Sequence, residues 1–129
     1  MHDQEPASIL IVDDEPSILK MLEGEISYHG YKTIAAPHAK AACQLAEKQP
    51  KIDLLITDII MPGMNGIDLA REITSLHPDI RIVFMSGHYN PSVFEKSLPE
   101  KNYDFMVKPF GLDTLMNTIR NALAFPDVP

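Results

Sequence analysis

Five short runs of β-forming residues alternate with segments of helical spacing, and this alternation limits the fold more than any other feature. The runs cover residues 8–12, 32–35, 54–57, 81–85 and 105–107. Helical connections between successive strands make right-handed crossovers and therefore parallel strands. The runs at 9–12 and 54–56 are apolar without alternation, as in strands that helices cover on both faces. The pattern predicts an α/β fold, a doubly wound parallel sheet of five strands with five helices.

The helical segments differ in how clearly their ends and faces are marked. The first begins near Pro16 and stops near Gly30, residues typical of those positions. The second and third cover about 39–49 and 66–76, and the fourth, at about 91–98, is short. The last carries an apolar stripe at steps of three and four: Leu112, Leu115, Met116, Ile119 and Leu123.

Length and composition indicate one soluble domain. The chain has 129 residues, and we expect a core at about 8–124 with flexible ends at 1–7 and 125–129. A net charge of −7 argues against direct nucleic-acid binding, which needs a basic surface. No apolar run approaches the roughly 20 residues of a membrane span. The first residues do not resemble a signal peptide, so we expect a cytoplasmic protein with no membrane contact.

The cysteine and histidine residues do not suggest a site of their own. Cys43 is the single cysteine and lies among alanines, so we expect a small core residue without a disulfide. The five histidines show no pair at metal-binding spacing, so a zinc site is not expected.

Acidic residues follow two of the predicted strands. Asp13 and Asp14 come directly after the first strand, and Asp58 comes directly after the third. The carboxyl ends of parallel strands meet at one edge of the sheet, where open α/β sheets hold their ligands. Carboxylates brought together there repel one another unless a hard divalent cation neutralises them. The sequence therefore predicts a Mg²⁺ site at this edge.

Two further strand ends complete the groups needed for phosphoryl transfer. Ser86 follows the fourth strand and Lys108 follows the fifth. Asp58 can act as the nucleophile and form an aspartyl phosphate. The Lys108 amine can neutralise developing charge, and the Ser86 hydroxyl can hydrogen-bond a phosphoryl oxygen. Metal-dependent transfer of a phosphoryl group to a carboxylate is the chemistry that this set of residues favours.

The chain resembles a receiver domain of the two-component response-regulator family from Ile9 to about Leu123. Four motifs carry the resemblance: Ile-Val-Asp-Asp-Glu-Pro at 11–16, Asp-Ile-Ile-Met-Pro-Gly-Met-Asn-Gly at 58–66, Met-Ser-Gly at 85–87 and Lys-Pro-Phe at 108–110. Together, in this order and at these strand ends, they are highly specific. The resemblance implies a flavodoxin-like fold with strand order 2-1-3-4-5.

The resemblance also implies a function and a ligand set. Asp58 would accept a phosphoryl group from a histidine kinase or a histidine phosphotransfer protein, with Mg²⁺ as cofactor. Asp13, Asp14, Asp58 and the backbone carbonyl of Ile60 would contact the metal. Such a protein is a signalling phosphoacceptor that catalyses only its own phosphorylation and dephosphorylation, and is not a metabolic enzyme.

Two residues match the positions of the family's conformational switch. Ser86 would move toward the phosphoryl group, and the Phe105 ring would then turn inward. The surface of the fourth helix, fifth strand and fifth helix would change shape and be read by a downstream output domain or protein. The family also implies a cis peptide bond between Lys108 and Pro109, and a monomer or a phosphorylation-linked dimer.

Two alternatives remain open at this point. A phosphatase of the haloacid dehalogenase type also uses an aspartate, Mg²⁺, a hydroxyl and a lysine. Its nucleophile, however, follows the first strand in an Asp-x-Asp pattern, whereas Asp13 and Asp14 are adjacent, and no insertion could form a cap. The other alternative is a receiver that only binds proteins without being phosphorylated. The complete set of Asp58, Ser86 and Lys108 beside the two acids argues against it.

Overall fold

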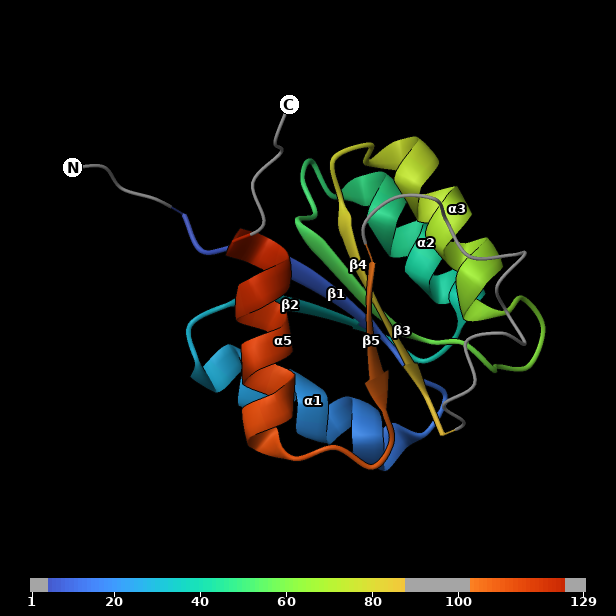
Figure 1. Ribbon diagram of the computed structural model, residues 1–129. Coiled ribbons are helices and arrows are strands. Elements are labelled where there is room, and N and C mark those ends of the chain that lie inside the picture. The colour runs from blue at the N-terminus through green and yellow to red at the C-terminus, as the bar shows by residue number, and fades with distance from the viewer. Residues whose placement is uncertain (1–4, 88–102, 125–129) are drawn as a thin grey trace.

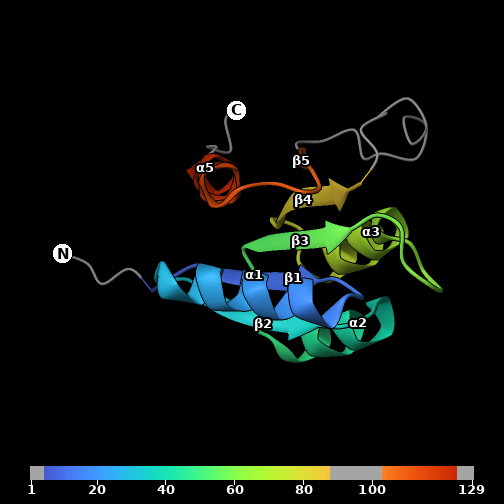
Figure 2. The same ribbon diagram turned by 90° about the horizontal axis from the view of Figure 1, so that it is seen from below.

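A five-stranded parallel sheet forms the centre of the molecule in the computed structural model, which describes residues 5–87 and 103–124. The strands are β1 (Ser8–Val12), β2 (Lys32–Ala36), β3 (Leu54–Asp58), β4 (Arg81–Ser86) and β5 (Tyr103–Val107). Their order is β2-β1-β3-β4-β5, and every neighbouring pair is parallel. Figure 2 shows the strands side by side in this order. The predicted fold and strand order are confirmed.

Helices cover both faces of the sheet. Helices α1 (Pro16–Tyr28) and α5 (Leu112–Ala124) lie on one face, and α2 (Ala39–Lys48) and α3 (Gly66–Leu76) lie on the other (Figure 1). The helix predicted at 91–98 lies outside the described residues. Within the part of the chain that the structure describes, no helix combines the length and the apolar character that crossing a membrane requires.

The central strands β1 and β3 are buried along their whole length. Successive side chains of a strand point to opposite faces, so each strand supplies two separate clusters. Leu10 and Phe84 pack with α2 and α3, whereas Ile9 and Val83 pack with α1 and α5. Burial on both faces explains why these strands are apolar without alternation. Cys43 is partly buried against the cluster beneath α2 and α3 and forms no disulfide, in agreement with its predicted packing role.

Four of the predicted strands extend beyond their predicted limits, and β2 does so by one residue, to Ala36. β3 includes Asp58 and β4 includes Ser86, although both residues are polar and were predicted to lie just beyond the strands. Backbone hydrogen bonds continue even past these positions, with Ile59 N–H donating to Met85 O at 3.0 Å. β5 begins two residues earlier than predicted, at Tyr103. Asp58 is therefore held by the sheet and is not part of a loop.

The helices begin and end at residues whose local chemistry defines their limits. Pro16 occupies the first turn of α1, and Gly30 follows that helix with a φ of +95°. The Asn65 side chain caps α3 by accepting a hydrogen bond from Asp68 N–H at 2.8 Å. These ends place α1 and α3 directly after the loops that follow β1 and β3, at the carboxyl edge of the sheet.

Candidate functional site

Three carboxylates from two neighbouring strands meet at the carboxyl edge of the sheet. Asp13 and Asp14 follow β1, and Asp58 is the last residue of β3. One oxygen from each side chain lies within 4.8 Å of the others. Asp13 is fully buried, Asp58 is nearly buried and Asp14 is exposed. The cluster is therefore anchored in the interior at Asp13 and opens to solvent at Asp14.

Lys108 joins two of these carboxylates. Its Nζ atom lies 2.8 Å from Asp13 Oδ2 and 3.0 Å from Asp58 Oδ2, and its side chain is only 18% exposed. The Lys108 N–H donates to Ser86 O at 2.8 Å, which extends the pairing of β4 with β5 as far as the site. The Lys108–Pro109 peptide bond is cis, as the family resemblance implied. One ammonium thus links β1, β3 and β5 where they end.

Asp13 is held at both of its carboxylate oxygens. Its Oδ1 accepts a hydrogen bond from Glu15 N–H at 2.8 Å, while Oδ2 receives the Lys108 amine. Hydrogen bonds to a charged acceptor are shorter and stronger than those between neutral groups. The Asp13 carboxylate therefore has a fixed orientation in the site.

Burial and like charges oppose the ionised form of Asp58. Burial raises the pKa of Asp58, the hydrogen bond and charge of Lys108 lower it, and the negative charges of Asp13 and Asp14 raise it again, so that the pKa lies above its ordinary value. For Lys108, burial lowers the pKa, but the hydrogen bonds and charges of Asp13 and Asp58 outweigh burial and leave the pKa raised. Lys108 thus remains a cation beside carboxylates that still repel one another.

The donor set fits a hard divalent cation. All three side chains offer carboxylate oxygens, which are the ligands that Mg²⁺ prefers. The single ammonium of Lys108 leaves an excess of negative charge when all three carboxylates are ionised. A bound divalent cation would remove that excess and relieve the repulsion by Asp13 and Asp14, which adds to burial in raising the pKa of Asp58.

The start of α3 packs against the backbone of Asp58 at Gly66. A Cβ atom on Gly66 would lie 2.0 Å from the carbonyl oxygen of Asp58. Gly66 N–H also donates to Ile59 O at 2.7 Å. The sequence analysis gave Gly66 no individual role. The signal that could have identified it is a glycine in the first turn of a helix, directly after the capping Asn65, where glycine is otherwise unfavourable.

The remaining predicted residues occupy different surroundings. Ser86 ends β4, next to Met85, the pairing partner of Asp58 on β3, and it is buried. Phe105 is partly buried on β5 and packs against the cluster beneath α2 and α3, so it is not part of the acidic cluster. The Ile60 side chain is 58% exposed. The structure therefore brings Asp13, Asp14, Asp58 and Lys108 together. Ser86, Phe105 and Ile60 lie outside this cluster.

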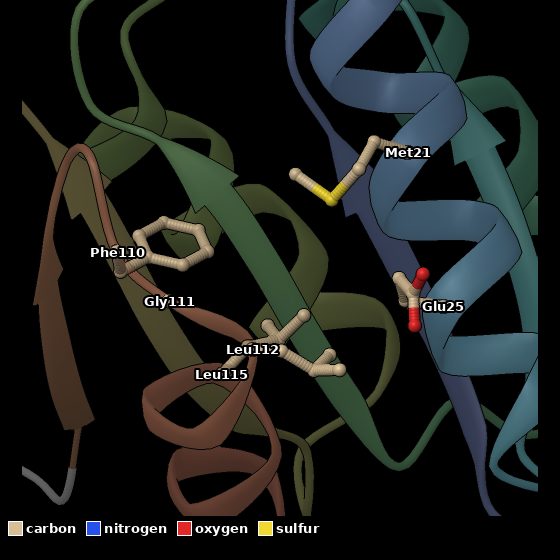
Figure 3. Close-up of a pocket in the computed structure, with 6 residues that line it drawn as sticks. All are labelled: Met21, Glu25, Phe110, Gly111, Leu112 and Leu115. Atoms are coloured by element: carbon tan, nitrogen blue, oxygen red, sulfur yellow. The ribbon is translucent and has the colours of Figure 1, made fainter.

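A shallow pocket lies between α1 and the residues that lead into α5. It is lined by Met21, Glu25, Phe110, Gly111, Leu112 and Leu115. Figure 3 shows the Met21 side chain extending from α1 toward the Phe110 ring on the opposite wall. Phe110 follows Lys108 by two residues, so this wall of the pocket begins at the site. Met21 and Leu112 are each 46% exposed, which gives the pocket an apolar rim.

The comparisons with known proteins agree with the family resemblance seen in the sequence motifs. A family model described as the response regulator receiver domain matches residues 9–120. The response regulator receiver protein CpdR of Brucella abortus is 31% identical over 89% of this chain and 95% of its own length. The sensor kinase CckA of the same organism is 32% identical over 94% of this chain, which spans only 13% of that kinase.

One similar solved structure is a complex with Mg²⁺-BeF. The response regulator protein TrrA of Thermotoga maritima, crystallised in complex with Mg²⁺-BeF, has a TM-score of 0.76 to this chain. It is 29% identical, and the match covers 91% of this chain and 99% of the other.

Replacing Gly66 by alanine should lower the free energy of unfolding by about 1–3 kcal/mol, because the added methyl group must displace the Asp58 carbonyl. Urea unfolding of the variant and the wild type measures this difference. Gly24→Ala is the matched control, since Gly24 lies in α1 and a Cβ there meets nothing within 4 Å. Equal effects of the two substitutions would contradict the close approach at Gly66.

Without divalent cations, Asp58→Asn should be more stable than the wild type at neutral pH, and its advantage should shrink as the pH falls. Because the pKa of Asp58 is raised, the folded protein holds this proton more tightly than the unfolded chain. Wild-type stability therefore decreases as pH rises from near the ordinary value of 3.8 through the raised pKa. Asparagine does not titrate, and Lys108 keeps Asp13 as a partner.

Urea unfolding in EDTA, from about pH 4 to about pH 8, tests this pH dependence. A stability difference that stays constant across the range would show that the charge of Asp58 is not the cause.

Proposed function

Since this chain belongs to the response regulator receiver domain family, we propose that its acceptor is Asp58, phosphorylated from a histidine kinase or a histidine phosphotransfer protein. The observation that supports this most directly is the meeting of Asp13, Asp14 and Asp58, two of which, Asp13 and Asp58, contact the Lys108 amine. The family match also favours a receiver over a phosphatase of the haloacid dehalogenase type. That the whole chain is one receiver domain with a core at about 8–124 stays a prediction.

In the proposed reaction, a carboxylate oxygen of Asp58 attacks the phosphorus atom of a phosphohistidine. An O–P bond forms, the N–P bond breaks, and the imidazole nitrogen keeps the electron pair and takes a proton from solvent. Lys108 already lies 3.0 Å from Asp58, so its ammonium can stabilise negative charge on the transferred group. Asp13 keeps Lys108 in that position through its own contact of 2.8 Å. The chain thereby catalyses its own modification, and hydrolysis of the aspartyl phosphate reverses it.

The proposed cofactor is Mg²⁺, held by Asp13, Asp14, Asp58 and the backbone carbonyl of Ile60. The grouping of the three carboxylates and the Mg²⁺-BeF complex of the Thermotoga relative support this assignment. When bound, the ion would neutralise phosphoryl oxygens and carboxylates together.

We further propose that Ser86 and Phe105 transmit the modification. Ser86 is buried at the end of β4 and pairs with Val107 on β5, so a shift of Ser86 toward a new dianion would act directly on β5. Phe105 lies on that strand and is only partly buried, so an inward turn of its ring would bury more of its apolar surface. The surface that includes β5 and α5 would then change shape and be read by an output domain or protein, or by a second copy of the chain.

The donor must be a protein that can bring a histidine to Asp58. Its contact surface therefore has to lie around the carboxyl edge of the sheet. The pocket between α1 and the start of α5 offers an apolar surface beside that edge, with Met21 and Leu112 at its rim (Figure 3). These residues are suited to pack against a helix of the donor.

Incubation with Mg²⁺ and acetyl phosphate should add one phosphoryl group to the wild type, as measured by intact mass. Asp58→Asn should remain unmodified, because the amide oxygen is a poor nucleophile. Wild type in EDTA is the second control and should be modified far more slowly. Equal modification of wild type and Asp58→Asn, or none of either with acetyl phosphate and phosphoramidate as donors, would contradict the proposal.

The apolar side chain of Ile60 should prolong the phosphorylated state. It is exposed two residues after Asp58, where it can obstruct the water molecule that hydrolyses the aspartyl phosphate. Ile60→Asn should therefore lose its phosphoryl group several-fold faster, and its backbone carbonyl remains available to the metal. Loss of mass over time after removal of the donor measures this rate. Met64→Asn, a change at another exposed side chain, serves as control; an unchanged rate in Ile60→Asn would refute the obstruction.

A further inference from the structure

We infer that the buried hydroxyl of Thr57 positions the acceptor site by holding the peptide bond that follows Asp58. This inference depends on the proposed function, since it assigns a role in the same site to a residue that does not touch the metal or the phosphoryl group. The juxtaposition that carries it is the approach of the Thr57 hydroxyl and of Gly66, which has no side chain, to the same carbonyl oxygen of Asp58.

Thr57 is fully buried in the middle of the sheet. It pairs with Val12 on β1 and with Phe84 on β4. A hydroxyl in such surroundings needs a hydrogen-bond partner. The Thr57 Oγ1 donates to the carbonyl oxygen of Asp58 at 2.9 Å, a bond that is itself buried. The Thr57 hydroxyl therefore uses its proton in a hydrogen bond to the backbone of Asp58, the proposed acceptor.

The peptide group between Asp58 and Ile59 is held at both ends. Its carbonyl accepts from Thr57, and its N–H donates to Met85 O at 3.0 Å. The next peptide group is held as well, because Ile59 O accepts from Gly66 N–H at 2.7 Å. The carbonyl of Ile60, the proposed backbone ligand of the metal, belongs to the peptide group that follows. Its position relative to the carboxylates is thus set by two restrained peptide groups.

Gly66 explains why the hydroxyl matters for the direction of the Asp58 carbonyl. That carbonyl points to the space that a side chain at position 66 would fill, with 2.0 Å between its oxygen and an ideal Cβ. Such a close approach leaves little tolerance for rotation of the peptide plane. Without the Thr57 hydrogen bond the carbonyl would still be limited by Gly66 but would lose the donor that sets its direction, so that even a small tilt of the plane would change the aim of the Asp58 carboxylate and the place of the Ile60 carbonyl.

The test uses substitutions that separate the hydroxyl from the shape of the side chain. Thr57→Val keeps the volume and removes the hydroxyl, whereas Thr57→Ser keeps the hydroxyl. The rate of phosphorylation by acetyl phosphate is measured by intact mass as a function of Mg²⁺ concentration. We expect Thr57→Val to need about 10-fold more Mg²⁺ for half of its maximal rate, the scale typical for loss of an outer-shell partner of a metal site. Thr57→Ser should restore nearly wild-type behaviour.

A matched control separates positioning from stability. Thr33→Val removes another strand hydroxyl, on β2, whose exposed contact is with Ser27 of α1 at 2.8 Å, and should leave the Mg²⁺ dependence unchanged. Thermal unfolding in EDTA is recorded for every variant. A Thr57→Val protein that is less stable but has wild-type Mg²⁺ dependence would overturn the inference. If that variant does not fold, Thr57→Cys, which replaces the hydroxyl by a weakly donating thiol, is compared with Thr57→Ser instead.

The result also distinguishes this inference from the proposed function. A wild type that neither acetyl phosphate nor phosphoramidate can modify would refute the proposed function itself. A wild type that is modified at Asp58, together with a Thr57→Val variant of identical Mg²⁺ dependence, would refute only the role of Thr57.

Discussion

The contact of the Lys108 ammonium with Asp13 and Asp58 is the interaction on which the organisation of this molecule depends. It joins the ends of β1, β3 and β5, which are far apart in sequence, at a single nitrogen atom. Asp13 is fully buried, and an ionised carboxylate is unfavourable there without a partner. The sheet brings the carboxylates together, and the positive charge of Lys108 offsets part of their mutual repulsion. The remaining negative charge is what makes the site suited to a divalent cation.

The backbone around Asp58 shows how local packing serves this arrangement. The aspartate is the last residue of a strand that is buried throughout, so its Cα is as rigid as the core. Beyond it, Gly66 allows α3 to approach the Asp58 carbonyl more closely than any side chain would permit. The motif at 58–66 is therefore both a chemical and a steric unit. Its first residue carries the proposed acceptor carboxylate, and its last residue leaves room for the backbone that presents it.

The sequence predicted most of this fold, because the features that define it are local. Continuous apolar runs identified β1 and β3, and proline and glycine marked the ends of α1. The strand ends were less predictable: Asp58 and Ser86 are polar, yet backbone pairing carries the strands through them. The site was predictable as a set of residue types at one edge. The division of the two oxygens of Asp13 between Glu15 and Lys108 was not, since it depends on packing between segments distant in sequence.

The same electrostatic balance links the site to the rest of the sheet. Lys108 continues directly from β5, and its N–H donates to Ser86 at the end of β4. Any change of charge on Asp58 therefore acts on the side chain of Lys108, a residue whose backbone follows β5 and is bonded to the end of β4. A phosphoryl dianion on Asp58 would draw Lys108 and Ser86 toward it, and the strain would pass along β5 to Phe105, which is only partly packed. In the proposed switch no separate transmission device is needed, because Lys108, the cation beside the acidic cluster, directly follows β5, the strand that would carry the output surface.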